Sequence, residues 1–330
     1  VKIPKWPFDK FATGDRMLGT KMKATGEVMA IGRTFKSSFK KAVASLEDKH
    51  PGILHYKFEN LPDEELLQNL YIQDDRRIFR VAEALKRNFD VKKVQEITKI
   101  DPWFINQIKD IVGLEFEMSI KPLDLELYKK AKDYGYLDCE ISDISNVSID
   151  ELKEYDYPAA FRIVDTCAGE FHASTPYFYS TYGEACELEE YKMEHGEVNS
   201  KEPPQEKGGN QKKGNIVVLG SGPIRIGQGI EFDYCSVHAS MAILQNGYES
   251  VMVNSNPETL STDFDIASRL YFEPMNAENV MNIIRKEKPE GVMVQFGGQT
   301  AINLAPKLAR EGVKILGTSL ESIDMVEDRK

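Results

Sequence analysis

The chain is 330 residues long, carries a net charge of −11 and contains four cysteines. This length allows about two or three domains, each with its own core. The negative charge argues against nucleic acid or an anionic membrane as the main partner, and no apolar run reaches the roughly 18 residues that a membrane-spanning helix needs. The cysteines are scattered without a CxxC pair, which indicates free thiols in a cytoplasmic protein more than a disulfide framework.

Residues 1–47 predict the tail of a domain. Lys2–Phe8 holds two prolines among apolar residues, which is typical of an extended edge segment. Gly26–Gly32 predicts a short buried strand, and Thr34 stands where a helix cap is expected. The apolar face of that helix recurs every three or four residues: Phe35, Phe39, Val43 and Leu46. Such a segment cannot build a core alone, and because the chain opens at Val1 instead of a methionine we expect a piece of something larger.

Residues 48–200 predict a helical region. Asp74–Asn88 carries one apolar stripe, Asp101 followed by Pro102 marks a helix start, and Ser148–Glu151 matches a capping box. Between Arg162 and Tyr182 the pattern becomes irregular and aromatic. This stretch is either a packed irregular segment or a surface that docks a partner, since interfaces favour Tyr and Phe.

The stretch 195–214 breaks the chain. It contains two prolines in a row, a glycine pair and many charged residues, with almost nothing apolar. This composition predicts a solvated linker, which we assign to 201–214, and therefore a domain boundary.

Residues 215–330 predict alternating strands and helices. The expected strands are Ile216–Leu219, Ser250–Asn254, Gly291–Gln295 and Lys314–Leu316, and the expected helices end near Asn246, Lys288 and Glu311. This alternation predicts a doubly wound, Rossmann-like parallel sheet, with ligand-facing groups at the carboxyl ends of the strands. The fold class expected for the chain is thus α/β with an all-α middle domain.

The loop after the first of these strands is rich in glycine, at positions 220, 222, 227 and 229. A dinucleotide site would need a third glycine where Arg225 stands, and an acidic residue where the second strand ends in Asn254. Both departures disfavour NAD or FAD. A P-loop is excluded because no GKS or GKT follows the glycines.

Several motifs together resemble one family. Gly220–Tyr234, Val253–Thr259, Gln295–Thr300 and Glu327–Arg329 resemble the start of the second, carbamoyl phosphate-forming half of the large subunit of carbamoyl phosphate synthetase. Lys2–Phe11 and Gly26–Thr34 resemble the end of its first, carboxyphosphate-forming half, and Asp101–Phe104, Arg162–Ala168 and Tyr179–Tyr182 resemble its oligomerisation domain. The resemblance covers almost the whole chain in the right order. It implies an ATP-grasp tail at 1–47, an oligomerisation domain at 48–200, a linker at 201–214 and a pre-ATP-grasp domain at 215–330.

The resemblance also implies a function. The family is a ligase that makes carbamoyl phosphate from bicarbonate, ammonia and two ATP, with Mg²⁺ or Mn²⁺, and a glutaminase subunit or domain supplies the ammonia from glutamine. Its unstable carbamate travels through an internal channel, and closed sites protect such intermediates from hydrolysis. The loop positions that match the channel lining are Arg225, Gly229, Glu231 and Glu258. We expect homo-oligomers of the parent, no catalytic or metal-binding residue in this piece, and no activity of the piece alone.

The residues of the loop leave alternatives open. Arg225 could attract a carboxylate-like species, or could form an ion pair with Glu231 or Glu258 that braces the loop. Gly229 would leave room for a passing molecule. Arg329 matches an arginine that contacts ATP in the fold that would follow, and a guanidinium suits phosphate because it binds two oxygens at once.

Other functions are weighed against this one. A stand-alone Rossmann-like nucleotide-binding or assembly module would bind a nucleotide within 215–330, and a scaffold would self-associate through 48–200. His238 lacks a second ligand in sequence and is expected to be structural. Cys235 lacks an evident base and is expected to be a packed residue and no nucleophile.

Overall fold

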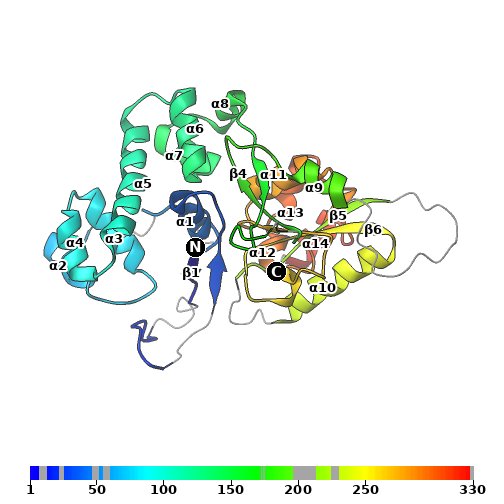
Figure 1. The fold of residues 1–330 in the computed structure, drawn as a ribbon, viewed down its shortest axis with the longest axis horizontal. Helices are drawn as coiled ribbons and strands as arrows, with labels where there is room; N and C mark the ends of the chain where they lie inside the picture. The colour runs from blue at the N-terminus through cyan, green and yellow to red at the C-terminus, as the bar shows by residue number, and fades with distance from the viewer. Residues whose placement is uncertain are drawn as a thin grey trace. The chain divides into compact units, whose positions relative to one another are not determined.

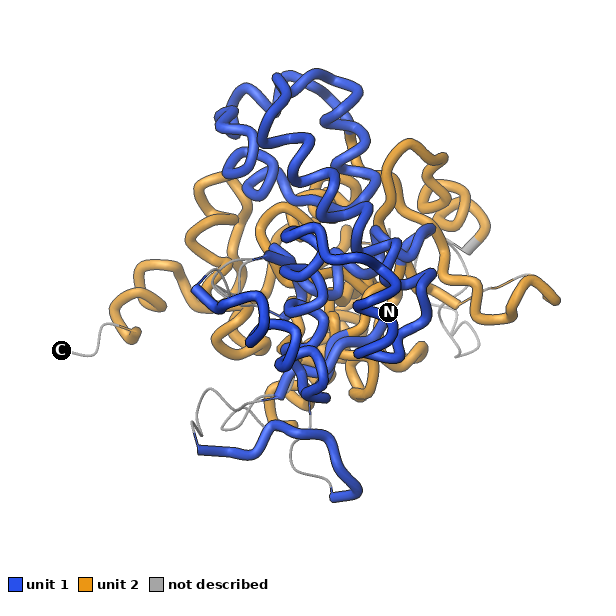
Figure 2. The backbone as a smooth tube through the Cα atoms, turned by 90° about the vertical axis from the view of Figure 1, so that its left-hand side faces the viewer, with its two compact units in different colours: residues 1–28, 32–157 blue, residues 29–31, 158–330 orange. Residues whose placement is uncertain are grey.

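The computed structural model describes residues 1–6, 13–21, 26–46, 52–54, 60–171, 173, 175–195, 213–223 and 230–327. These form two compact units, coloured separately in Figure 2. The first unit comprises residues 1–28 and 32–157, and the second comprises residues 29–31 and 158–330.

The first unit is mainly helical (Figure 1). Its described elements are β1 (Lys2–Pro4), β2 (Glu27–Met29), α1 (Phe35–Ala44), α2 (Asp63–Asn69), α3 (Arg77–Lys86), α4 (Val91–Thr98), α5 (Pro102–Ile120), α6 (Leu125–Tyr134), α7 (Asp138–Ser145), α8 (Ile149–Leu152) and the 3-10 turn η1 (Lys153–Tyr155). Strands β1 and β2 pair with each other. The caps read from the sequence are confirmed: the side chains of Thr34, Asp101 and Ser148 accept hydrogen bonds from the first turns of α1, α5 and α8.

Helix α5 lies at the centre of this unit and packs against α1, α3, α4, α6 and α7. Its buried side chains are apolar and lie on one side of the helix: Ile105, Ile108, Ile111, Val112, Leu114 and Met118. Phe104 is exposed. It stands within the first turn, where its ring contacts that of Phe35 at 5.3 Å between centroids.

Helix α1 is fastened to the helical region by a buried cation. Lys40 is fully buried and forms an ion pair with Glu140, and its ammonium lies 4.0 Å from the ring centroid of Tyr136. The Tyr136 hydroxyl donates to the Ile111 carbonyl at 3.0 Å and to Glu115 at 3.1 Å. Burial raises the pKa of Glu115 above its ordinary value. Helix α1, which the sequence assigned to the preceding tail, therefore belongs to the same unit as α5, α6 and α7.

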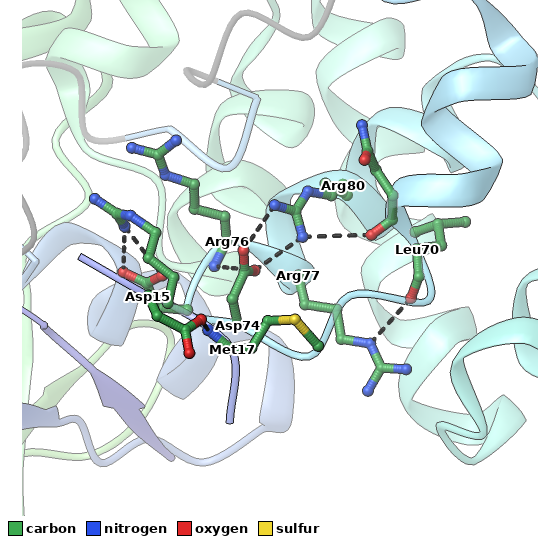
Figure 3. Close-up of polar contacts among 10 residues, drawn as sticks. Asp15, Met17, Leu70, Asp74, Arg76, Arg77 and Arg80 are labelled. Atoms are coloured by element: carbon green, nitrogen blue, oxygen red, sulfur yellow. Dashed lines mark hydrogen bonds and ion pairs between the residues drawn. The ribbon is translucent and has the colours of Figure 1, made fainter. Parts of the chain in front are cut away.

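A cluster of arginines at the start of α3 braces the corner between α2 and α3 (Figure 3). Arg80 donates to both carboxylate oxygens of Asp74 at 2.8 Å, the bidentate geometry that suits a guanidinium. Arg77 donates to the Leu70 carbonyl at 3.3 Å. Arg16 pairs with Asp75 at 2.9 Å, which ties the segment 13–21 to the same corner.

The second unit is built on a seven-stranded sheet among the described residues. Its elements are β3 (Ala160–Ile163), β4 (Tyr177–Thr181), α9 (Leu188–His195), β5 (Lys213–Leu219), α10 (Ile230–Gln245), β6 (Tyr248–Asn254), the 3-10 turn η2 (Leu260–Thr262), β7 (Arg269–Phe272), α11 (Ala277–Glu287), β8 (Gly291–Met293), α12 (Gly298–Ile302), α13 (Ala305–Arg310), β9 (Ile315–Leu316) and α14 (Leu320–Glu327). The strand order is β3-β4-β7-β6-β5-β8-β9, and every pair is parallel except β3 with β4. The prediction of a mostly parallel α/β sheet is confirmed.

Both faces of this sheet are buried, as parallel sheets require. Alternate residues of each central strand enter different cores. Val217 and Val251 pack with side chains of α9, α11 and α13, whereas Ile216 and Met252 pack with α10. Helices therefore cover the sheet on both sides.

The structure differs from the sequence prediction between 158 and 195. This stretch was expected to be part of the helical region, with an irregular aromatic segment at 162–182. It instead supplies β3, β4 and α9 to the second unit. The aromatic residues are the reason, because Phe161 and Phe178 are fully buried against Tyr271 of β7.

Two further differences lie in the second unit. The helix expected at 300–311 is divided into α12 and α13. Pro306 stands in the first turn of α13, where its missing N–H is tolerated, whereas a continuous helix would have needed that donor. Strand β7 was not predicted, because it begins with a charged residue, Arg269, whose buried partner is Glu287 at 2.8 Å. Burial opposes the charge of Glu287, but Arg269 and Lys192 hold its pKa below the ordinary value.

Candidate functional site at the carboxyl end of the sheet

The strand order reverses between β5 and β8. Counted from β5, the chain lays down β6 and β7 on one side and then β8 and β9 on the other. In doubly wound sheets, ligands bind at this switch point, outside the carboxyl ends of the strands. The segments that follow β5, β6 and β8 therefore form the candidate site.

The loops after β5 and β8 touch through their backbones. A Cβ added at Gly297 would lie 2.5 Å from the Leu219 carbonyl oxygen and would also collide with the carbonyl oxygen of Gly220. A Cβ at Gly220 would lie 2.7 Å from the side chain of Asn254. Only glycine fits at these two positions, which explains part of the glycine content of the motifs.

The side chain of Asn254, at the end of β6, joins the loops after β5 and β6. It is fully buried, and its oxygen accepts from the Gly222 N–H at 3.1 Å, the Ser255 N–H at 2.8 Å and the Asn256 N–H at 3.3 Å. Its amide nitrogen donates to the Ser261 hydroxyl at 3.1 Å. One residue thus fixes both loops. In sequence this position indicated only the lack of an acidic ribose ligand, and its bracing role was missed.

The first turn of α10 is fixed to the same edge. Asp233 is buried, and one of its carboxylate oxygens accepts from the Ser261 N–H at 3.1 Å. Asn256 in turn accepts from the Glu258 N–H at 3.1 Å. Glu231, in the first turn of α10, and Glu258, in the loop after β6, are both exposed. The segments that carry these two predicted residues are therefore neighbours, held together by the contact between Asp233 and Ser261.

Three of the predicted site residues cannot be placed. Arg225 and Gly229 belong to 224–229, and Arg329 belongs to 328–330, which lie outside the described residues. An ion pair between Arg225 and either glutamate thus stays a prediction.

Several buried polar atoms at this edge have no hydrogen-bond partner among the residues that the structure describes. They are the second carboxylate oxygen of Asp233, the Ser255 hydroxyl and the Asn256 amide nitrogen. The residues are nearly or fully buried. The edge behind the glycine loop is therefore polar, with donors and acceptors that water or a small polar molecule can satisfy.

A short upstream segment also reaches this edge. The Met29 N–H donates to the Ser255 carbonyl at 3.0 Å, and Met29 and Ile31 pack against the core beneath α10. Although residues 29–31 precede the helical region, they belong to the second unit. Sequence reasoning had no signal for this.

Other candidate chemistry is weak among the described residues. No group of three His, Cys, Asp or Glu side chains could hold a metal ion there. Within the same ranges no helix is long and apolar enough to cross a membrane. His238 is exposed and its ring contacts that of Tyr234, with centroids 4.2 Å apart. Cys235, expected to be packed, is exposed because it lies on the outer side of α10, and all four cysteines are free thiols.

Comparison with known proteins decides the family. The model of the carbamoyl phosphate synthase preATP-grasp domain matches residues 212–325, and the model of the oligomerisation domain of the carbamoyl-phosphate synthetase large chain matches residues 27–159. The large chain of carbamoyl phosphate synthase from Clostridium acetobutylicum is 53% identical over 337 aligned residues, covering 100% of this chain. The large chain from Thermoanaerobacter sp. (strain X514) is 50% identical over 334 aligned residues, again covering 100% of this chain.

The chain belongs to the carbamoyl phosphate synthase large-chain family.

It spans 30% of the length of the first of these relatives and 29% of the second. The match to the carbamoyl phosphate synthase oligomerisation domain ends at residue 159, close to the end of the first unit at residue 157. The match to the preATP-grasp domain begins at residue 212, directly before β5. The candidate site thus lies wholly within the matched preATP-grasp domain.

Proposed function

We propose that this chain works as part of a carbamoyl phosphate synthase large chain, an ATP-dependent ligase that makes carbamoyl phosphate from bicarbonate, ammonia and two ATP. Within it, residues 215–330 supply part of the wall of the passage that carbamate takes between the two halves. The observation that carries the proposal is the Asn254 junction. It holds the loops after β5 and β6 in a fixed relation at the switch point of a preATP-grasp domain.

The chemistry of the proposed lining suits a passing anion. Exposed carboxylates at Glu231 and Glu258 keep the wall polar and negative, so a carboxylate-like molecule would not be held tightly. Arg225 would offset that charge by attracting it. Gly229 would leave the bore open, because glycine has no Cβ. The rigid polar edge formed by Asn254 and Asp233 supports the idea that these loops keep their shape.

The first unit supports a second part of the proposal, self-association of the parent. Helix α5 exposes Trp103, Phe116 and Ile120, at 53%, 65% and 61%, all on one side of the helix together with Gly113. A Cβ at Gly113 would meet nothing within 4 Å, so this side is open to close approach. We propose a second copy of the large chain as the occupant, because the matching family model describes an oligomerisation domain.

The cofactors and partners of the reaction are assigned to the longer chain. ATP with Mg²⁺ or Mn²⁺ would bind to the ATP-grasp folds of the large chain, and Arg329 would contact ATP there. A small glutaminase subunit or domain would supply ammonia, and the free thiols support a cytoplasmic location.

The test compares the 330-residue chain with the longer large chain that contains it. Bicarbonate-dependent ATP hydrolysis and carbamoyl phosphate formation are measured for both. We expect turnover by the longer chain and none above background by the 330-residue chain. Turnover by the short chain at the level of an intact synthetase would contradict the proposal, and saturable nucleotide binding to the short chain would favour the stand-alone module instead.

A further inference from the structure

Helix α10 carries an exposed apolar surface beside the candidate site. Ile230, Tyr234, Met241 and Leu244 are 76%, 58%, 44% and 38% exposed, and their spacing of four, seven and three residues places them on one side of a helix. The ring of His238 fills the gap in this row, in contact with Tyr234.

The segment that follows β6 extends the same surface. It runs along α10, because Ser261 donates to Asp233 at 3.1 Å and the Ser240 hydroxyl donates to the Ile266 carbonyl at 2.7 Å. Leu260, directly before the first contact, and Phe264, between the two, are 46% and 57% exposed. We call the six apolar residues of the two segments the α10 face: Ile230, Tyr234, Met241, Leu244, Leu260 and Phe264.

The described charges at the start of the α10 face and along the segment after β6 are acidic, whereas Lys213 lies at the far end of α10 and donates to the Asn246 carbonyl at 3.3 Å. Helix α10 contains neither Lys nor Arg over its 16 residues. The exposed charged residues at its start and along the adjoining segment are all acidic: Glu231, Glu258, Asp263 and Asp265. An apolar centre with an acidic rim fits a partner surface that presents apolar side chains surrounded by Lys and Arg.

We propose that the α10 face is the docking surface for another domain of the same large chain, one with an apolar centre and a basic rim. Exposed apolar surface of this extent marks an interaction site, and the relatives are more than three times as long as this chain, which spans 30% of the first of them. The docking does not rest on the proposed function.

A second copy of this chain is the less suitable occupant. In a symmetric dimer through the α10 face, the acidic rim of one copy would meet the acidic rim of the other. Like charges brought together in this way oppose association, and the net charge of −11 adds to the repulsion.

Hydroxyl-radical footprinting tests the proposal on unmodified protein. The oxidation rates of Tyr234 and Met241 are read by mass spectrometry in the 330-residue chain and in the longer large chain. Met193, which is 84% exposed on α9, serves as an internal reference. We expect both rates, relative to Met193, to fall severalfold in the longer chain. Equal rates in the two chains would overturn the proposal. A rate in the short chain that falls as its concentration rises would indicate a second copy as the occupant, and would overturn it too.

A variant of the longer chain gives an independent readout. Met241→Lys places an ammonium in the centre of the α10 face, and we expect the Tyr234 rate to return toward that of the short chain. Met193→Lys is the matched control and should leave Tyr234 protected. If Met241→Lys unfolds the protein, the comparison of unmodified chains still decides. If Tyr234 is protected in the longer chain but the channel proposal fails its own test, the docking proposal is retained and only the channel proposal is lost.

Discussion

At the scale of single residues, Asn254 determines the geometry of the candidate site. Its side chain is the shared partner of Gly222 and Ser261, so two loops depend on one amide. The sequence named Asn254 only as a departure from a dinucleotide site. Its hydrogen-bond partners are separated from it by up to 32 positions, and such contacts cannot be inferred from spacing.

Replacing Asn254 by alanine should loosen both loops. Asn254→Ala would leave the buried Gly222 N–H without its acceptor, and an unsatisfied buried donor costs about 1–3 kcal/mol. Urea unfolding measures the loss of free energy of unfolding. Asn246→Ala is the matched control, because Asn246 is exposed at the end of α10, and it should change stability by about 0.5 kcal/mol or less. If both variants lost the same free energy of unfolding, the Asn254 side chain would not hold the two loops together as described.

Glu115 is the residue for which we predict a pH effect. Burial raises its pKa in the folded state above the ordinary value of 4.5, so the folded protein binds a proton more readily than the unfolded chain. Stability is therefore lost as the pH rises from 4.5 through the folded pKa. Glu115→Gln should be more stable than the parent at neutral pH, with the difference vanishing toward pH 4.5.

Glu117 gives a control of opposite sign in the same helix. Hydrogen bonds from Lys121 and Lys130 lower its pKa to about 2, so its contribution is present above its ordinary pKa and is lost as the pH falls toward 2. Glu117→Gln should not stabilise the protein at neutral pH. Urea unfolding across the pH range compares both variants, and a Glu115→Gln variant that is less stable than the parent at neutral pH would contradict the assignment.

At the scale of elements, the sequence correctly predicted those features that depend on residues close together in the chain. The caps at Thr34, Asp101 and Ser148 and the buried strands β5 and β6 are where the sequence placed them. Elements defined by distant partners were missed. Strands β3 and β4 are short; β3 pairs with β4, and β4 pairs with β7. Arg269 is buried in an ion pair with Glu287, a residue 18 positions away in sequence.

The cap of α5 offers a test at this scale. The Asp101 carboxylate accepts from the Trp103 N–H at 2.8 Å, and loss of such a cap costs about 1 kcal/mol. Asp101→Ala should lower the free energy of unfolding by that amount. Asp150→Ala, which removes an exposed carboxylate in the first turn of α8, should have a smaller effect. Equal free energies of unfolding for the two variants would contradict the assignment of Asp101 as the cap of α5.

At the scale of the whole molecule, the chain forms two units whose members are not always neighbours in sequence. Residues 29–31 lie in the second unit although their neighbours lie in the first, and 158–195 joins the sheet instead of the helices. Composition marks linkers, but it does not reveal which core a short segment enters. The family motifs and their order could be recognised along the whole sequence, because such motifs depend only on residue type and spacing.

We propose above that the loop after β5 forms part of a channel wall in the large chain. The most direct measurement is the amount of carbamoyl phosphate formed per ATP hydrolysed by a longer chain that carries Gly229→Phe. The control is Gly19→Phe, since a Cβ at Gly19 would meet nothing within 4 Å. We predict that the yield per ATP falls sharply with Gly229→Phe and is unchanged with Gly19→Phe. An unchanged yield with Gly229→Phe would contradict the account.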